Sequence, residues 1–239
     1  MMKLAPQVNT ALELLEAAGY EAYLVGGAVR DFVRDSSPAK DWDIATNALP
    51  EQVKAVFAGF RLIETGLKHG TVTVVIDHIQ LEITTYRVDG QYHDSRHPDA
   101  VQFVPQVQPD LARRDFTINA MAYAPGEGLI DLYGGRSDLH ACLMRCVGDP
   151  EERFAEDALR ILRAVRLAAQ LDFALEEATE RAALDMRQSI QNISAERIYT
   201  ELDKLLAAPA AGKVLSRYGR ILAGAVPEIE PCIGCTQPG

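Results

Sequence analysis

Cysteine is scarce in this chain, and long hydrophobic runs are missing. The 239 residues contain four cysteines at uneven spacings, too few for a disulfide framework, so we expect a reducing, cytoplasmic setting. No apolar run approaches the length of a membrane span, and the N-terminus lacks the charged-then-apolar pattern of a signal peptide. These absences predict a protein without a membrane partner.

Positive charge is also in short supply. Lysine and arginine number 24 against 34 aspartates and glutamates, which gives a formal net charge of −10. This balance argues against attraction of nucleic acid over the whole surface, so we expect no DNA partner. Arginines nevertheless gather at residues 113–114 and at Arg160, Arg163 and Arg166, and a local basic site is compatible with the acidic whole.

The order of apolar and polar residues indicates a mixed sheet with flanking helices, followed by an all-helical region. The composition, 48% hydrophobic and 24% charged, is that of a globular protein. We expect strands over residues 22–25, 41–45, 60–64, 71–76 and 80–84, and helices over residues 8–18, 50–57, 151–171, 176–186, 195–206 and 210–218. Residues 86–109 show no period over most of their length, which is typical of a functional or mobile connection.

These elements predict an α+β protein of two domains. The first domain is expected over residues 1–148 and the helical domain over residues 149–226. Residues 227–239 show no period and are expected to be a disordered tail or a truncation point.

Two glycines follow the first expected strand. Gly26 and Gly27 open the stretch Gly-Gly-Ala-Val-Arg-Asp, which indicates a strand-to-helix turn. Glycines at such a turn let a phosphate approach the main chain, where unpaired N–H groups and the helix dipole favour an anion. A glycine pair alone is more often only a turn, so this interpretation needs support from the rest of the chain.

Two aspartates follow in Asp41-Trp42-Asp43. Side chains alternate faces along a strand, so Asp41 and Asp43 are expected on one face and Trp42 on the other. Two carboxylates on one face repel each other unless a cation lies between them, as in Mg²⁺ sites that bridge substrate phosphates. A solvated strand end and the metal site of a nucleotide-sugar glycosyltransferase are alternatives for this pattern.

Charge is dense over residues 113–120, Arg-Arg-Asp-Phe-Thr-Ile-Asn-Ala. Arginine forks suit triphosphate oxygens, and Asp115 or Asn119 is suited to hold a ribose hydroxyl or to lock an arginine in place. An exposed connection that carries surface charges is the structural alternative.

A row of charged residues lies in the expected helix over residues 151–171. Asp157 and Arg160 are one turn apart and therefore adjacent on a helix surface, and Arg163 and Arg166 continue the row. A solvated ion pair explains one Asp–Arg pair, but not three arginines with one acid at the end. A carboxylate beside a guanidinium offers an acceptor and donors in one plane, which matches the Watson–Crick edge of cytosine or adenine.

Taken in order, these stretches resemble the class II tRNA nucleotidyltransferases, which comprise CCA-adding enzymes and bacterial poly(A) polymerases. The resemblance covers most of the chain, through residues 26–31, 41–46, 113–122, 156–166 and 193–198. It implies a polymerase-β-like nucleotidyltransferase head with a mixed sheet, followed by an all-helical neck. It also implies CCA addition to the tRNA 3′ end from CTP and ATP, with A-only addition and poly(A) synthesis as alternatives within the family.

The resemblance assigns roles to residues of the first domain. Gly27 and Arg30 would contact the triphosphate, and Arg114 would bind the nucleotide. Asp41 and Asp43 would bind catalytic Mg²⁺. The implied reaction is attack of an RNA 3′-hydroxyl on the α-phosphate of a nucleoside triphosphate, with pyrophosphate leaving and two metal ions clamping the attacking and leaving oxygens.

Base selection is implied for the helical domain. Asp157 and Arg160 would form a protein template for the incoming base, and Arg163 and Arg166 would add nucleotide contacts. The alternative from another class is a non-catalytic nucleotide- or RNA-binding module. The glycosyltransferase alternative does not explain the Asp157–Arg160 helix.

Three weaker features complete the sequence. Residues 86–99 resemble the flexible loop of full CCA-adding members, which favours CCA over CC addition. Glu82 is a candidate third carboxylate, although a strand-edge glutamate in water is equally expected, and Cys232 and Cys235 form only half of a zinc pattern. Family members continue into helical domains that hold tRNA, so we expect a truncated chain or fragment without the C-terminal tRNA-binding region.

Overall fold

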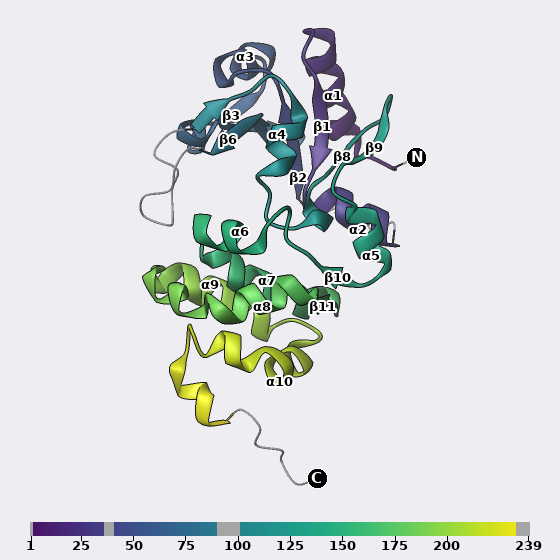
Figure 1. Ribbon diagram of the computed structural model, residues 1–239. Helices are drawn as coiled ribbons and strands as arrows, with labels where there is room; N and C mark the ends of the chain where they lie inside the picture. Colours follow the sequence, from purple (N-terminus) through teal and green to yellow (C-terminus); the bar gives the residue numbers. More distant parts are fainter. Residues whose placement is uncertain (1, 36–40, 90–100, 233–239) are drawn as a thin grey trace. The chain divides into compact units, whose positions relative to one another are not determined.

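The computed structural model describes residues 2–35, 41–89 and 101–232. These residues form two compact units, the first ending at Leu139 and the second beginning at His140 (Figure 1). No helix in the described ranges combines the length and apolar character needed to cross a membrane.

The first unit is built on a seven-stranded sheet with the order β3-β4-β5-β2-β1-β8-β9. Its strands are β1 (Ala22–Val25), β2 (Trp42–Thr46), β3 (Arg61–Ile63), β4 (Thr71–Ile76), β5 (Ile79–Thr85), β8 (Met121–Ala124) and β9 (Gly128–Asp131). Strands β2 and β5 run parallel, and the other neighbouring pairs are antiparallel. The mixed sheet predicted from the sequence is therefore confirmed.

Helices cover both faces of this sheet. The first unit contains α1 (Pro6–Ala17), α2 (Gly27–Asp35), α3 (Pro50–Val56), α4 (Val107–Ala112), α5 (Gly135–His140), and the 3-10 turns η1 (Leu67–His69) and η2 (Thr117–Asn119). Helices α1, α2 and α3 pack against the sheet on the face of the fully buried Leu24 and Ile44. Successive strand residues point to opposite faces, so Asp43 and Ala45 lie on the other face, together with α4.

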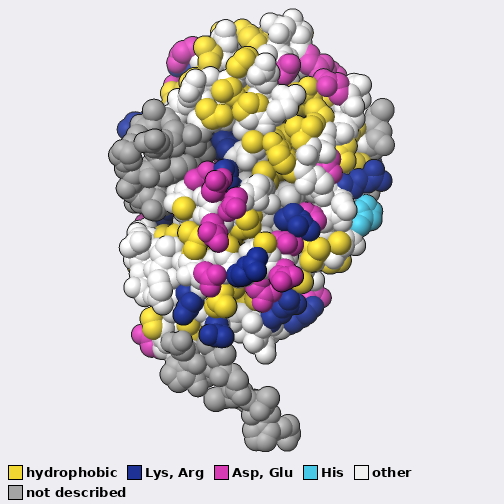
Figure 2. Space-filling view, in the orientation of Figure 1, with side chains coloured by type: hydrophobic (Ala, Val, Ile, Leu, Met, Phe, Trp, Pro, Cys, Tyr) yellow, Lys and Arg dark blue, Asp and Glu magenta, His cyan; other side chains and the backbone are white. Residues whose placement is uncertain are grey.

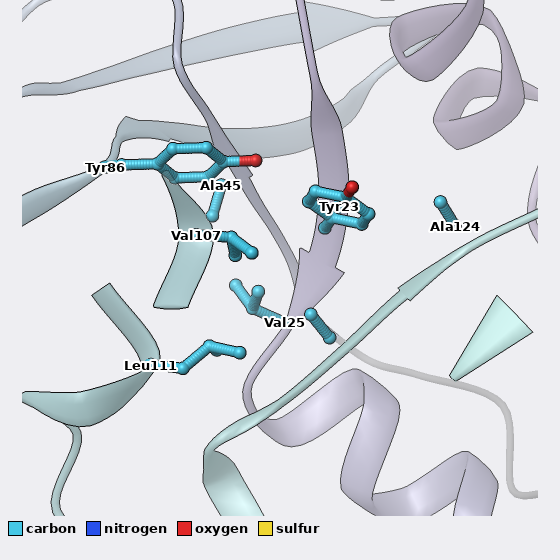
Figure 3. Close-up of a cluster of buried hydrophobic side chains, with 8 residues drawn as sticks. Tyr23, Val25, Ala45, Tyr86, Val107, Leu111 and Ala124 are labelled. Carbon is cyan, nitrogen blue, oxygen red and sulfur yellow. The ribbon is translucent and has the colours of Figure 1, made fainter. Parts of the chain in front are cut away.

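The core beneath α4 holds this second face together. Val107 and Leu111 of α4 pack on Val25 of β1 and Ala45 of β2, beside the ring of the fully buried Tyr86 (Figure 3). Burying side chains of this size stabilises the fold by roughly 1.5–3 kcal/mol each. The C-terminal part of α4, at Leu111, is thereby packed beside Val25, the last residue of β1.

A tight hairpin joins β4 and β5, as predicted. Asp77 and His78, at φ of 44° and 67°, form its two-residue turn. The expected irregular connection over residues 86–109 contains regular structure in its described part: β6 (Arg87–Asp89) pairs antiparallel with β7 (Val101–Phe103), and α4 follows. The residues expected to resemble a flexible loop lie largely outside the described ones.

The second unit is mainly helical, as predicted. It contains α6 (Pro150–Glu156), α7 (Leu159–Leu171), α8 (Glu177–Asp185), η3 (Arg187–Asn192), α9 (Ala195–Leu206), α10 (Ala211–Leu222) and η4 (Pro227–Cys232). Strand β10 (Leu143–Met144) pairs in parallel with β11 (Ala174–Leu175), which ties residues before 148 to this unit. Of residues 227–239, which were expected to be a disordered tail or a truncation point, residues 227–232 form η4 and the others lie outside the described residues.

Charges of both signs mix on the surface of the helical unit. On the face shown in Figure 2, Lys and Arg side chains alternate with Asp and Glu over these helices. Exposed pairs such as Arg217 with Glu180, 3.2 Å apart, belong to this pattern. This face therefore does not present a continuous basic surface, in keeping with the net charge.

Candidate functional site

The turn between β1 and α2 is the centre of the candidate site. Gly26 has a φ of +72°, which glycine adopts without strain, and α2 begins at Gly27. The amide of Arg30 makes the first helical bond, donating to the carbonyl of Gly26 at 3.1 Å. The amides of Gly27, Ala28 and Val29 therefore have no acceptor within the helix, and at the positive end of its dipole they suit an anion.

Gly26 leaves room for two charged side chains from other elements. A Cβ atom at this position would lie 3.2 Å from Oδ2 of Asp43 and 3.5 Å from Nη1 of Arg114. Asp43 belongs to β2, and Arg114 follows the end of α4. The structure thus brings three residues of three separate sequence motifs to one point.

Asp43 carries a perturbed carboxyl group. Burial raises its pKa to about 6, with a further rise from Glu82, an opposing effect of the Arg114 guanidinium and a smaller rise from Asp41. Glu82 on β5 lies directly beside Asp43 in the parallel register, and Asp41 is exposed just before β2. A nearby cation would stabilise the ionised form of Asp43 among these neighbouring carboxylates.

A divalent cation fits these donors. Within residues 2–35, 41–89 and 101–232, no group of three or more His, Cys, Asp or Glu side chains is placed to hold a metal ion by itself. Asp41 and Asp43 match instead a hard cation that takes one or two carboxylates and completes its shell with water and substrate phosphates. Together with the amides of α2, the arrangement can bind a metal-bound polyphosphate.

Arg30 is held beside the glycine turn by its neighbours. Its Nε and Nη2 donate to Asp31 at 2.9 and 3.1 Å, and its Nη1 donates to Oδ1 of Asn119 at 2.9 Å. Asn119 donates through Nδ2 to Oδ1 of Asp115 at 3.2 Å. The sequence left two roles open for Asp115 or Asn119, to hold a ribose hydroxyl or to lock an arginine in place. Asn119 has the second role, because it accepts from Arg30.

Asp110 was missed by sequence reasoning. It is 1% exposed, and both Arg113 and Arg114 donate to its carboxylate, at 2.8 and 3.3 Å. The signal was available, since Asp110 stands three and four residues before the two arginines, a spacing at which helical side chains meet. The charge-dense motif covers residues 113–120 and therefore does not include Asp110.

Asp157, in the second unit, lies between two helices and not within one. Its φ of −147° and ψ of 105° are extended, so α6 ends at Glu156 and α7 begins at Leu159. Its Oδ1 accepts from the amide of Leu159 at 3.0 Å, and its Oδ2 accepts from Nη2 of Arg197 at 2.7 Å. The expected single helix over residues 151–171 is therefore wrong, because this side chain caps a new helix.

The arginine row lies on α7, but its members have different surroundings. Arg160 donates to the carbonyl of Arg153 at 3.2 Å and to the carboxylate of Glu156. Its partner is thus Glu156, where helical spacing had suggested Asp157. Arg163 is half-buried.

Arg166 is enclosed between α7 and α9. It is 8% exposed, and its Nε donates to the carboxylate of Glu201, which is 6% exposed. Its Nη1 donates to Oε1 of Gln170 at 2.6 Å. Arg166 therefore ties two helices of the second unit together.

Two family descriptions match the chain, one for each part. Residues 22–145 match the family described as the Poly A polymerase head domain. Residues 172–230 match the one described as the probable RNA and SrmB-binding site of polymerase A.

Curated relatives carry the name CCA-adding enzyme. The one from Lactobacillus helveticus is 50% identical over 198 residues, which cover 83% of this chain and 49% of the relative. The one from Geobacillus stearothermophilus is 46% identical over 204 residues, with 85% and 50% covered. The chain spans about half the length of the curated relatives it matches.

Solved structures agree with the sequence relatives. The Bacillus stearothermophilus CCA-adding enzyme in complex with CTP superposes with a TM-score of 0.81 at 41% identity, covering 92% of this chain and 52% of that one. The Thermotoga maritima CCA-adding enzyme complexed with tRNA gives a TM-score of 0.76 at 26% identity, with 94% and 54% covered. Since the description of the Poly A polymerase head domain matches residues 22–145, more than half of the chain, the chain belongs to the poly(A) polymerase head-domain family of tRNA nucleotidyltransferases and bacterial poly(A) polymerases.

Proposed function

We propose that the chain carries the nucleotidyltransferase head and helical neck of a CCA-adding enzyme, which adds CMP and AMP from CTP and ATP to the 3′ end of tRNA. The observation that carries the proposal is the convergence of Gly26, Asp43 and Arg114 at the start of α2. Relatives named CCA-adding enzyme, with about 50% sequence identity to the chain, support the proposal.

The first unit binds the triphosphate and supports the transfer in this proposal. Gly27 and Arg30 bind the phosphates, and Arg114 binds the nucleotide. Asp41 and Asp43 are the catalytic carboxylates. As the RNA 3′-hydroxyl attacks the α-phosphate, negative charge shifts toward the departing pyrophosphate, and fixed N–H donors and guanidinium groups at this place stabilise that charge.

The ion held by Asp41 and Asp43 is proposed to be Mg²⁺. When bound, it would polarise the phosphate oxygens and favour ionisation of the attacking hydroxyl. The position of Glu82 beside Asp43 makes Glu82 a candidate third carboxylate. A pKa near 6 leaves Asp43 mostly ionised above pH 7, the state that can bind a cation.

The second unit supplies base selection. Asp157, oriented by Arg197, offers an acceptor, and Arg160 offers donors, so that together they can match the Watson–Crick edge of cytosine or adenine. Arg163 is proposed as a further nucleotide contact. For Arg166, whose donors go to Glu201 on α9 and to Gln170 on its own helix, we propose a supporting role through packing in place of the direct contact expected from the sequence.

The proposed functional division does not coincide with the boundary between the two units. We assign the head to residues 1–148 and the neck to residues 149–226, and residues 140–148 connect the two although they belong to the second unit. Contacts with the body of the tRNA are assigned to the half of the relatives that this chain does not span. Since the substrates are tRNA and nucleoside triphosphates, the proposed setting is the cytoplasm.

The test is nucleotide incorporation by the chain. Radiolabelled CTP or ATP is incubated with Mg²⁺ and with tRNA that ends before, within or after CCA. CMP and AMP incorporation that stops after CCA is the expected result. Incorporation of AMP alone, only onto tRNA ending in CC, would assign A-only addition, and continued AMP incorporation would assign poly(A) synthesis.

A longer relative provides the control. No incorporation by this chain, beside activity of the Lactobacillus helveticus enzyme, would show that the unspanned half is required for transfer. The binding of labelled CTP without incorporation into any RNA would favour the non-catalytic module.

A further inference from the structure

One buried carboxylate joins α4 and the two arginines that follow it to the start of β6. Asp110 on α4 is 1% exposed. Its Oδ1 accepts from the backbone amide of Arg87 at 3.3 Å, and from Nε and Nη2 of Arg113 at 3.0 and 2.8 Å. Its Oδ2 accepts from Nη2 of Arg114 at 3.3 Å. The two oxygens therefore serve different arginines.

The Oδ1 side of this group is anchored to the backbone. Nε of Arg113 also donates to the carbonyl of Arg87 at 3.1 Å, so Asp110 and Arg113 bond both the amide and the carbonyl of the residue that begins β6. The carboxylate cannot rotate without breaking these bonds. Its Oδ2 is consequently held toward Arg114.

Apart from its attraction to the nearby Asp43, Arg114 depends on few other protein contacts. Its Nη1 donates to the carbonyl of Asn119 at a long 3.4 Å, and its buried Nε has no hydrogen-bond partner among the described residues. A guanidinium carries five N–H donors on a flexible stem, whose conformational freedom is lost on binding. If it is already held beside Gly26 and Asp43, less is lost when a phosphate binds.

We propose that Asp110 is a positioning residue that holds Arg114 ready for the phosphates of the nucleotide. This rests on the proposed function, in which Arg114 binds the nucleotide. A charge argument predicts the opposite sign, because removal of a carboxylate beside a triphosphate site would tighten the binding of an anion. The sign of the change in CTP affinity therefore separates positioning from simple charge.

The test is a double-mutant cycle on CTP binding. The Kd of CTP with Mg²⁺ is measured by titration calorimetry for the whole chain and for Asp110→Asn, Arg114→Ala and the double variant. Asp110→Asn is expected to weaken binding about 10-fold, because a charged hydrogen bond to the arginine is lost. In the Arg114→Ala background it should change the Kd by less than about 2-fold. Tighter binding, or an equal loss in both backgrounds, would overturn the proposal.

Asp138→Asn is the matched control, since Asp138 is another buried carboxylate of the first unit, which accepts from Oγ1 of Thr117 at 2.7 Å. It should change the Kd by less than about 3-fold, and a loss as large as that of Asp110→Asn would contradict the assignment. If Asp110→Asn does not fold, Asp110→Glu keeps the charge but moves both oxygens. The loss of CTP affinity in Asp110→Glu must also disappear in the Arg114→Ala background, and a loss that persists in that background overturns the proposal. Absence of CTP binding by the unsubstituted chain would overturn the proposed function as well.

Discussion

At the scale of single residues, the site depends on the absence of a side chain at Gly26. Gly26 takes a φ of +72° and lies against Asp43 and Arg114. A left-handed backbone costs other residues roughly 1–2 kcal/mol, and here a methyl group would also press on a carboxylate oxygen. The conformational and steric requirements for glycine thus coincide at the place where a phosphate is proposed to bind.

Gly26→Ala should lower nucleotide transfer by about 100-fold, because small displacements of catalytic groups have large effects on rate. The measurement is kcat/KM for CMP incorporation. Gly19→Ala is the control, since Gly19 has a φ of +86° but no atom within 4 Å of an added Cβ. Both variants should lose similar stability, and transfer should suffer only in Gly26→Ala. Equal transfer by the two variants would refute the steric argument.

Asp43 links the site to the pH dependence of stability. Its pKa is raised from 3.8 to about 6 in the folded state, so protonation favours the folded, metal-free protein below pH 4. That contribution is lost as the pH rises through 6. In EDTA at pH 8, Asp43→Asn should therefore be more stable than the unsubstituted chain by on the order of 2 kcal/mol.

Urea unfolding at pH 4 and pH 8 measures this difference. The gain of Asp43→Asn should shrink toward pH 4 and should be offset at pH 8 by Mg²⁺, which stabilises only the chain that keeps the carboxylate. If Asp43→Asn gains the same free energy of unfolding at pH 4 and at pH 8, burial of the charge is not the cause of the gain.

At the scale of elements, α7 is fastened to α9 by an ion pair that solvent hardly reaches. The side chains of Arg166 and Glu201 are 10% and 8% exposed. Loss of one partner leaves a buried charge alone, which is more costly than loss of both. The pair therefore belongs to the packing of the helical unit.

Arg166→Ala should destabilise the chain by about 3 kcal/mol, whereas the double variant Arg166→Met with Glu201→Leu should recover most of that loss. Urea midpoints measure both effects. The Kd of CTP should change less than about 3-fold in the double variant, as expected for a role in packing. A large loss of CTP affinity in the stable double variant would restore a direct nucleotide contact for Arg166.

Local patterns predicted some elements well and failed where partners were distant. The β4–β5 hairpin was predictable because alternating apolar residues flank a turn at Asp77 and His78. The break at Asp157 was not, because its charged partner Arg197 lies 40 residues away and a helical period runs through both sides. Strand β6 was missed for the same reason, since its pairing with β7 joins segments on either side of residues 90–100.

For the candidate site, residue types were predictable but their partners were not. The sequence indicated Arg30, Asp43 and Arg114 through their chemistry and order. It could not show that Arg160 pairs with Glu156 and not with Asp157, because this depends on where α6 ends. Helix ends are set by single capping bonds, which periodicity does not contain. The contacts of Asp110 with Arg113 and Arg114, in contrast, follow a spacing that the sequence does contain.

At the scale of the whole molecule, the chain is acidic and spans about half of its relatives. RNA affinity depends largely on contacts of Lys and Arg with phosphates, and a net charge of −10 does not supply them over the surface. We therefore expect a KM for tRNA at least about 10-fold above that of the Lactobacillus helveticus enzyme. The Kd of CTP should be within about 3-fold of that enzyme, because the proposed nucleotide site lies in the shared half. Equal KM values for tRNA would show that this half suffices to bind RNA.

The pairing of β2 with β1 on one side and β5 on the other has a consequence for folding. Val25, Asp43 and Glu82 lie opposite one another across these three strands. If β2 slipped by one residue, Ile44 would turn toward the site and Asp43 would enter the apolar layer beneath α1, α2 and α3, where an unpaired carboxylate is costly. A sheet with β2 shifted by one residue is therefore less stable, even without bound substrate. Asp43, which is proposed to hold a catalytic ion, therefore also favours the correct register of β2 when the sheet forms.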